Sequence, residues 1–185
     1  MCKFLISILI SSCKSETGGK PADYIPQLAR ADPDKFGVSV CSIDGQRFSI
    51  GDSTQGFSIQ STSKPFMYGL CLASLGNQVV QKFIGREPSG RQFNEIVMDH
   101  NNQPHNPMIN SGAIMSSALL LYMVQPEMSI SDKFEMVQNY LSRMAGHKFV
   151  GFQNSVYLSE KETADRNQAL AYYMRENGCF PRYVF

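Results

Sequence analysis

The chain has 185 residues, of which 43% are hydrophobic and 18% charged, and its formal net charge is +1 at pH 7. This composition is typical of a globular protein with an apolar core and lies outside the range of disordered chains. Lysines and arginines are scattered, which excludes a strongly basic surface for nucleic acid or an anionic membrane. The five cysteines are odd in number and widely spaced, so they favour a reducing compartment over a disulfide framework or a metal site.

Residues 1–17 are predicted to be a leader, separate from a folded body over 18–185. The apolar run of this leader, Phe4 to Ile10, is too short to span a bilayer. It only loosely resembles the hydrophobic part of a secretion signal. We therefore expect an intracellular protein with an irregular leader, a helical leader being the alternative.

The segment 37–50 predicts a β-hairpin. G-V-S-V-C-S-I at 37–43 is rich in β-forming residues, and Q-R-F-S-I at 46–50 continues the pattern. Asp44-Gly45 between them is a tight-turn pair. We expect a two-residue turn at this pair.

After Ser61 the apolar residues recur at helical spacing, which predicts a helical part over 61–178. The capping box Ser159-x-x-Glu162 predicts the start of the last helix, and Gly178 is suited to follow its end near Asn177. Prolines and asparagines at 98–112 predict a loop. The other expected helices cover 61–75, 79–84, 113–123 and 131–145.

A hairpin followed only by helices leaves a two-stranded sheet, which is marginally stable alone. The sequence therefore predicts an α+β body from which further strands of the sheet are missing.

The S-x-x-K spacing of Ser61 and Lys64 is typical of a serine nucleophile with a lysine base. Residues three apart share one helix face, so the lysine amine can reach the hydroxyl. At a helix N-terminus the backbone N–H groups also stabilise a developing oxyanion. The alternative is a capping serine with a lysine whose stem packs on the surface. The same spacing occurs at Ser11 and Lys14, where no site is expected, so the pattern alone favours this alternative.

The loop H-N-P-M-I-N-S-G at 105–112 ends at the start of an apolar helix. Asn110 offers an amide donor and acceptor to a polar substrate. The alternative is that Asn110 or Ser111 caps the helix.

Glu160 and Asn167 are seven residues apart, which places them on nearly the same side of the predicted last helix. A carboxylate and an amide in one cleft suit a substrate with an ammonium group. The alternative is a solvated charged face. The three histidines lack metal-ligand spacing, and no cofactor is expected.

Taken together, these segments resemble the glutaminase family, serine-dependent enzymes with a fold like that of β-lactamases and penicillin-binding proteins. The resemblance implies an α/β (α+β) fold. The matching stretches lie in family order from about Gly18 to Pro181, and residues 1–17 are expected to match nothing in the family. These stretches include G-G-K-P-A-D-Y-I-P-Q-L-A, F-S-I-Q-S-T-S-K, G-R-E-P-S-G-R-Q-F-N, P-H-N-P-M-I-N-S-G-A-I, S-E-K-E-T-A-D-R-N-Q-A-L-A-Y-Y-M and C-F-P.

The resemblance implies hydrolysis of L-glutamine to L-glutamate and ammonia through a seryl acyl-enzyme. Ser61 matches the family's nucleophile and Lys64 its general base. The residues that match substrate-binding positions are Tyr24, Gln60, Asn110, Glu160 and Asn167.

The resemblance also implies that the family's chain continues past C-F-P at 179–181 and returns to the sheet. We therefore expect a C-terminally truncated chain with the later strands missing. The expected partners are L-glutamine and further subunits, either copies of this chain or full-length glutaminase, in a mitochondrial or cytoplasmic setting.

Two alternatives stay open. The chain could be a catalytically dead short isoform that binds and modulates full-length glutaminase subunits. It could also be another serine hydrolase of the β-lactamase type, which the Glu160/Asn167 pair and the loop at 105–110 argue against.

Overall fold

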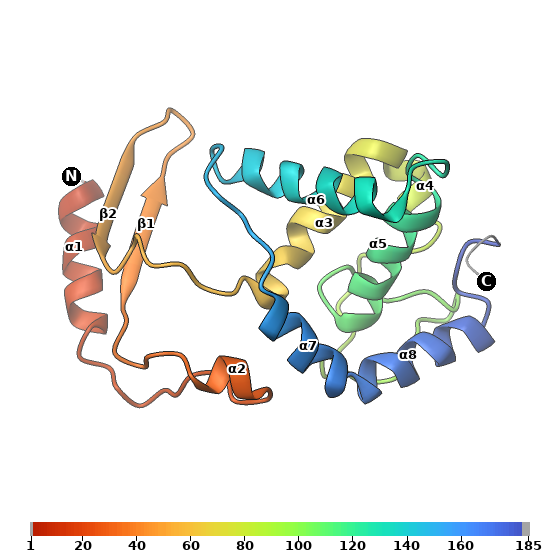
Figure 1. Cartoon of the computed structure of the whole chain (residues 1–185), viewed down its shortest axis with the longest axis horizontal. Coiled ribbons are helices and arrows are strands. Elements are labelled where there is room, and N and C mark those ends of the chain that lie inside the picture. The colour runs from red at the N-terminus through yellow and green to blue at the C-terminus, as the bar shows by residue number, and fades with distance from the viewer. Residues whose placement is uncertain (1, 183–185) are drawn as a thin grey trace. The chain divides into compact units, whose positions relative to one another are not determined.

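Helix α1, Cys2–Cys13, begins the chain in the computed structural model, which describes residues 2–182 but not the side chains of residues 2–6 and 9. A helix therefore stands where we expected an irregular leader, in agreement with the alternative. The described chain is α-rich and has one two-stranded antiparallel sheet (Figure 1). The chain folds into two compact units. The hairpin unit runs up to Ser58 and includes Gln153–Glu162, and the helical unit consists of Ile59–Phe152 and the residues from Thr163 on.

The hairpin unit contains the expected pair of strands. Strand β1, Gly37–Cys41, pairs antiparallel with β2, Arg47–Gly51, in a register that sets Gly37 opposite Gly51 and Cys41 opposite Arg47.

The predicted two-residue turn of this hairpin is wrong. Gly45 N donates to the Ser42 carbonyl at 3.0 Å, and Ser42 N donates to the Gln46 carbonyl at 2.9 Å. The central residues of the turn are therefore Ile43 and Asp44, and Gly45 follows them with a φ of 84°. A turn closed by a left-handed glycine forms a three-residue loop, which a D-G pair fits as well as it fits a two-residue turn.

Helix α2, Pro26–Ala29, packs against α7, Asn154–Glu162, in the same unit. Ile25, the residue before α2, is completely buried, and Ser159 in α7 is buried as well. This contact fixes the segment that carries Tyr24 relative to the helix that carries Glu160.

The helical unit begins with a short 3-10 turn, η1, Gln60–Ser63, which continues into α3, Lys64–Leu75. Pro65 lies in the first turn of α3, as expected, where its missing N–H does no harm. The remaining helices of the unit are α4, Asn77–Val80, α5, Asn110–Tyr122, α6, Ile130–Met144, and α8, Asp165–Glu176.

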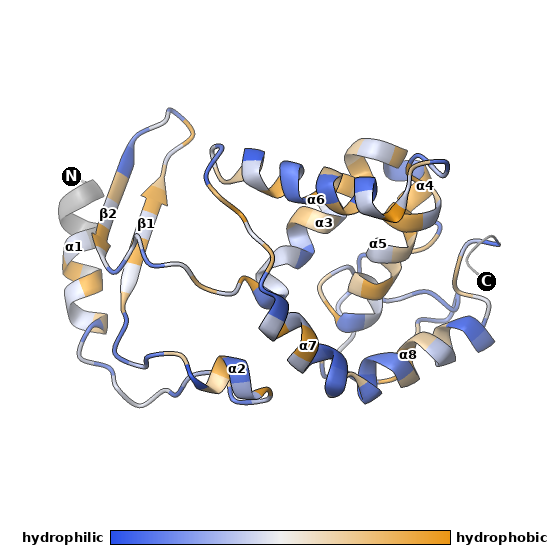
Figure 2. Cartoon of the chain, in the orientation of Figure 1, coloured by the Kyte–Doolittle hydropathy of each residue, from blue (hydrophilic) through white to orange (hydrophobic). Residues whose placement is uncertain are grey.

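The core of the helical unit is built around α5, which is buried on most sides as predicted. Helix α5 contacts α3, α6 and α8. Helix α6 is amphipathic, and its hydrophilic residues appear as blue turns in Figure 2. The buried apolar cluster comprises Leu70, Cys71, Val80, Ile84, Met115, Leu119, Leu120, Val124, Leu170, Met174 and Cys179.

The single last helix predicted from the capping box is wrong, because the chain forms two helices there, α7 and α8. Ser159 lies inside α7 and is 4% exposed, so it does not begin a helix. Asp165 stands in the first turn of α8, where a negative charge is favoured by the helix dipole. Glu160 and Asn167 therefore lie on different helices, and these helices belong to different units.

The predicted end of the last helix is confirmed. Gly178 has a φ of 65°, its N–H donates to the Arg175 carbonyl at 3.0 Å, and Cys179 N donates to the Met174 carbonyl at 3.0 Å. This pair of bonds satisfies the last carbonyls of α8 in the manner of a Schellman motif.

The loop predicted at 98–112 extends only to Ile109, and α5 begins at Asn110. Gly85 N donates to the Pro104 carbonyl at 2.8 Å, and Glu87 N donates to the His105 carbonyl at 2.9 Å. These bonds fix the loop that leads into Asn110. Within residues 2–182, no helix combines the length and the apolar content that crossing a membrane requires.

Candidate active site

Ser61 lies in the η1 turn that opens α3, and its side chain is exposed. Its hydroxyl takes part in no hydrogen bond with another described residue, so Ser61 does not cap the helix. The turn is held by its neighbours instead, because Thr62 N donates to the Ile59 carbonyl at 2.9 Å and Ser63 Oγ donates to the Gln60 carbonyl at 2.7 Å. The Ser61 hydroxyl is thus left accessible at the start of a helix.

Lys64 is the first residue of α3 and is half-buried. Its Nζ donates to Asn110 Oδ1 at 2.8 Å and lies 5.9 Å from the centre of the Phe93 ring. Burial lowers the pKa of the Lys64 amine. Among the described residues its one hydrogen bond goes to Asn110 and none goes to Ser61, although the two share the opening of α3.

Asn110 connects Lys64 to a third helix. The Asn110 carbonyl oxygen faces Lys64, so its amide group faces the other way and donates to Asn167 Oδ1 at 2.9 Å. The residue that caps α5 is Ile109, and the Asn110 side chain is used in this polar chain rather than as a cap. The structure therefore brings together three of the predicted site residues, Lys64, Asn110 and Asn167, from α3, α5 and α8.

In the hairpin unit, Tyr24 and Glu160 are brought together. The Tyr24 hydroxyl donates to Glu160 Oε1 at 2.7 Å, across 136 residues of sequence. Tyr24 remains 58% exposed and Glu160 is half-buried, so this pair faces solvent at its tyrosine end.

Two residues near Lys64 and Ser61 were not expected. Phe93 places its ring by the Lys64 amine, and its carbonyl accepts from Asn110 N at 2.9 Å. Nothing in the sequence indicated this role, because Phe93 lies in an irregular segment far from both partners. Ser63 stands at a middle position of S-x-x-K, and its hydroxyl donates to the carbonyl three residues before it, as serines in such turns do.

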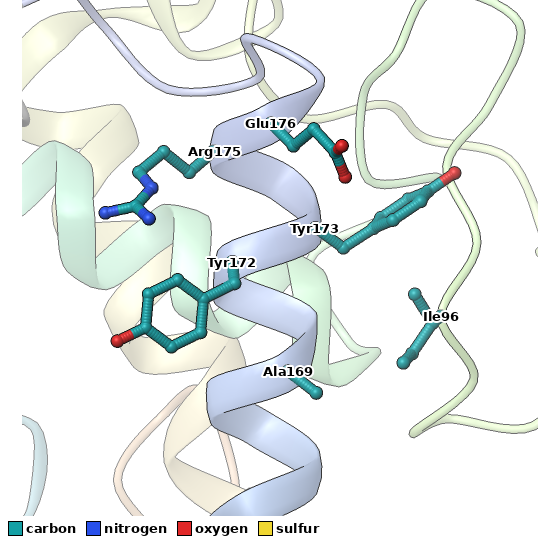
Figure 3. A pocket seen from close by; sticks show the side chains of 6 residues that line it. All are labelled: Ile96, Ala169, Tyr172, Tyr173, Arg175 and Glu176. Atoms are coloured by element: carbon teal, nitrogen blue, oxygen red, sulfur yellow. The ribbon is translucent and has the colours of Figure 1, made fainter.

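Two open hollows on the described surface are lined by other residues. One hollow, of about 580 Å³, lies along α8. Tyr173 and Ala169 of this helix project toward Ile96, whereas Tyr172 and Arg175 project from the opposite side of the helix (Figure 3). The other, of about 700 Å³, is lined by residues that include Tyr68, Arg86 and Met108. Neither contains a residue predicted for the site.

The family model that describes glutaminases matches residues 19–184 of the sequence. The chain belongs to the glutaminase family. The mitochondrial liver isoform of glutaminase from Mus musculus is 45% identical over 176 residues, which are 95% of this chain and 29% of that protein. A glutaminase from Microcystis aeruginosa is 44% identical over 161 residues, which are 86% of this chain and 46% of that protein.

This glutaminase-family chain therefore spans less than half the length of these curated relatives. Another relative, glutaminase 1 of Bradyrhizobium diazoefficiens, is 41% identical over 177 residues, or 96% of this chain. The alignment therefore takes in part of the leader at 1–17, and the expectation that these residues match nothing in the family is wrong for that part.

Among solved structures, this glutaminase-family chain is similar to crystal structures of a protein named Mglu. The native form superposes with a TM-score of 0.83 at 34% identity, and the match covers 95% of this chain and 42% of the Mglu chain. The tris and glutamate form superposes with a TM-score of 0.82 at 32% identity and covers 95% of this chain and 38% of that one. The α-rich architecture with a small antiparallel sheet is thus shared with Mglu.

Proposed function

We propose that this chain provides the serine-lysine part of a site that hydrolyses L-glutamine to L-glutamate and ammonia. The observation that carries the proposal is that one helix opening holds both a Ser61 hydroxyl without a hydrogen bond to any described residue and a half-buried Lys64 amine bonded to Asn110. Membership of the glutaminase family supports the choice of glutamine as substrate.

In the proposed acylation step, the neutral Lys64 amine takes the proton of Ser61 Oγ while Oγ bonds to the side-chain amide carbon of glutamine. The carbon–nitrogen bond then breaks, and the departing nitrogen takes the proton from Lys64 and leaves as ammonia. A water molecule, deprotonated by Lys64, attacks the ester carbon, and Ser61 regains its proton as glutamate leaves. Burial favours this role, since it lowers the pKa of Lys64 and so raises the fraction of neutral amine.

The substrate-binding roles are proposed on the same resemblance. Glu160, which accepts a hydrogen bond from Tyr24, suits the α-ammonium group of glutamine, and the amide of Asn167 suits its α-carboxylate. Asn110 and Gln60 offer further amide groups. In the structure Lys64 is hydrogen-bonded to Asn110, and Asn110 to Asn167. A substrate that binds the amides of Asn110 and Asn167 must therefore replace these hydrogen bonds with its own.

For the fold we propose the β-lactamase-like arrangement, which the antiparallel hairpin followed by a helical cluster supports. An assembly of several subunits, and a mitochondrial or cytoplasmic location, remain proposals of the same kind.

The experiment is an assay of ammonia and glutamate released from glutamine by the purified chain. We expect Ser61→Ala to abolish turnover while the far-ultraviolet circular dichroism stays unchanged. Ser117→Ala, an exposed serine on α5, is the matched control and should keep full activity. Turnover that survives in Ser61→Ala would show that the nucleophile is another group.

A second proposal is a non-catalytic short form that binds full-length glutaminase subunits. The observation that favours it is the exposure of apolar side chains on the sheet, 39% at Val40 and 37% at Ile50, which a partner subunit could cover. Absence of turnover together with co-purification of this chain and a full-length glutaminase would support it, and a strictly monomeric chain after co-expression would contradict it.

A further inference from the structure

The backbone directly before Ser61 is in an unfavourable conformation. Gln60 has a φ of 40°, in the left-handed region that residues with a Cβ rarely adopt. Three other described residues without glycine's freedom have positive φ, namely Asn102, Gln125 and His147. These three residues lie in turns or after the end of a helix. Gln60 instead lies before a helix, because it begins the 3-10 turn that continues into α3.

Such a conformation persists only where its surroundings hold it in place, and strained backbone is found at functional sites. Around Gln60 the holding contacts are specific. Ser63 Oγ donates to the Gln60 carbonyl at 2.7 Å, and the Thr62 hydroxyl and N–H both donate to the Ile59 carbonyl. The carbonyls on both sides of the Gln60 Cα are therefore fixed by the two residues inside S-x-x-K.

The consequence falls on Ser61 and Lys64. A change in the Gln60 φ rotates the chain that follows, so it changes the direction of the Ser61 hydroxyl. It also displaces the first residue of α3, Lys64, from its bond to Asn110. The half-buried Ser63 hydroxyl acts on neither side chain directly, since its partner is a main-chain carbonyl.

We propose that Ser63 is a positioning residue, whose bond to the Gln60 carbonyl holds the left-handed turn that presents Ser61 for reaction. This inference rests on the proposed function of Ser61 as a nucleophile. It assigns a role to a position inside S-x-x-K that neither the nucleophile nor the base requires to be a serine.

The test measures the rate at which a small fluorophosphonate labels Ser61, followed by mass spectrometry of the full chain. This reagent has no glutamine groups, so the proposed substrate contact of Gln60 does not enter. We expect Ser63→Ala to slow labelling about tenfold, as the loss of one positioning hydrogen bond allows. Ser63→Thr, which keeps the hydroxyl, should label within about threefold of the unchanged chain.

Two further variants separate positioning from damage to the fold. Ser117→Ala removes a similar hydroxyl-to-carbonyl bond, 3.0 Å long, on α5 and should label at the unchanged rate. Gln60→Gly added to Ser63→Ala should restore labelling, because glycine adopts positive φ without strain. Equal labelling of Ser63→Ala and the unchanged chain, with equal melting curves, would overturn the proposal.

Failure of the proposed function gives a different result. If Ser61 in the unchanged chain does not react, the nucleophile assignment fails and the inference fails with it. The Gln60 φ in a crystal structure of Ser63→Ala then shows separately whether the bond held the turn.

Discussion

At the scale of single residues, two effects act on Lys64 in opposite directions. The Asn110 carbonyl favours the charged ammonium form, because it accepts a hydrogen bond from it. Burial favours the neutral amine and lowers the pKa of Lys64. A lysine with a lowered pKa is suited to take a proton from a serine.

We expect kcat/KM for glutamine to rise with pH as Lys64 loses its proton, because only the neutral amine can accept the proton of Ser61. Since burial lowers this pKa from 10.5, the rise should lie at lower pH than for an ordinary lysine. A pH–rate profile measures it. Lys64→Arg should lose activity by more than about a hundredfold, because arginine does not deprotonate in proteins. A profile that falls through this pH range would contradict the assignment of Lys64 as the base.

The pair of Tyr24 and Glu160 allows a different test. Tyr24→Phe removes the hydroxyl that donates to Glu160 Oε1 and leaves the ring. Because Tyr24 is 58% exposed, we expect the free energy of unfolding to fall by no more than about 1 kcal/mol. KM for glutamine should rise several-fold if Glu160 holds the α-ammonium group.

Tyr172→Phe, an exposed tyrosine of α8, is the control for this change and should leave KM unaltered. Tyr24→Phe with an unchanged KM and a markedly lower melting temperature would show that the bond is structural.

At the scale of elements, patterns within one segment predicted the helical core and the strands. The predictions failed where the same short pattern is compatible with two different local structures. D-G fits both a two-residue turn and a three-residue loop, and the hydrogen bonds of Ser42 show the latter. S-E-K-E fits a helix start, but the contact of α7 with α2 buries Ser159 inside a helix.

The site divides in the same way. The residue types at Ser61, Lys64 and Asn110 could be selected from the sequence, because S-x-x-K and an asparagine-rich loop are local patterns. The bonds from Lys64 to Asn110 and from Asn110 to Asn167 could not, since they join residues 46 and 57 positions apart. Such contacts depend on how α3, α5 and α8 pack.

Helix α5 depends on close approach of the loop before it. A Cβ added at Gly112 would lie 2.1 Å from the Asn106 carbonyl oxygen and 2.7 Å from the Pro107 Cα. We expect Gly112→Ala to lower the free energy of unfolding by at least about 2 kcal/mol, because backbone cannot yield as a side chain does. Chemical denaturation measures this loss. The same change should reduce activity beyond the loss of folded protein, since the loop leads into Asn110.

Gly56→Ala is the matched control, because nothing lies within 4 Å of a Cβ at that position. It should alter the free energy of unfolding by less than about 0.5 kcal/mol. Equal stability of the two variants would show that the loop relaxes away from α5 at no cost.

At the scale of the whole molecule, the two units differ in how much apolar surface they bury. Of the buried apolar side chains in the described chain, the hairpin unit holds Ile10 and Ile25, and all others lie in the helical unit. Since burial of apolar surface is the main stabilising term, the helical unit should be the more stable of the two.

The cysteines report on this difference. Cys13 and Cys41, in the hairpin unit, are exposed, whereas Cys71 and Cys179, in the helical unit, are buried. Burial raises the pKa of Cys71 to about 12 and also raises that of Cys179. The thiolate is the reactive form, so both the burial of Cys71 and its raised pKa protect it from alkylation.

We therefore expect iodoacetamide at pH 8 to modify Cys13 and Cys41 at least about a hundredfold faster than Cys71, because the Cys71 thiol is buried and its pKa is raised. A Cys2→Ser background removes the cysteine whose side chain lies outside the described part, and peptide mass spectrometry gives each rate. In concentrated urea the four rates should become equal, which controls for local sequence.

At intermediate urea concentrations, Cys71 should become reactive only with the loss of α3–α5 packing, because its thiol donates to the Ser116 carbonyl of α5 at 3.3 Å. Rapid modification of Cys71 in native buffer would show that the helical unit opens without denaturant, and that the packing which positions Lys64 against Asn110 is not maintained.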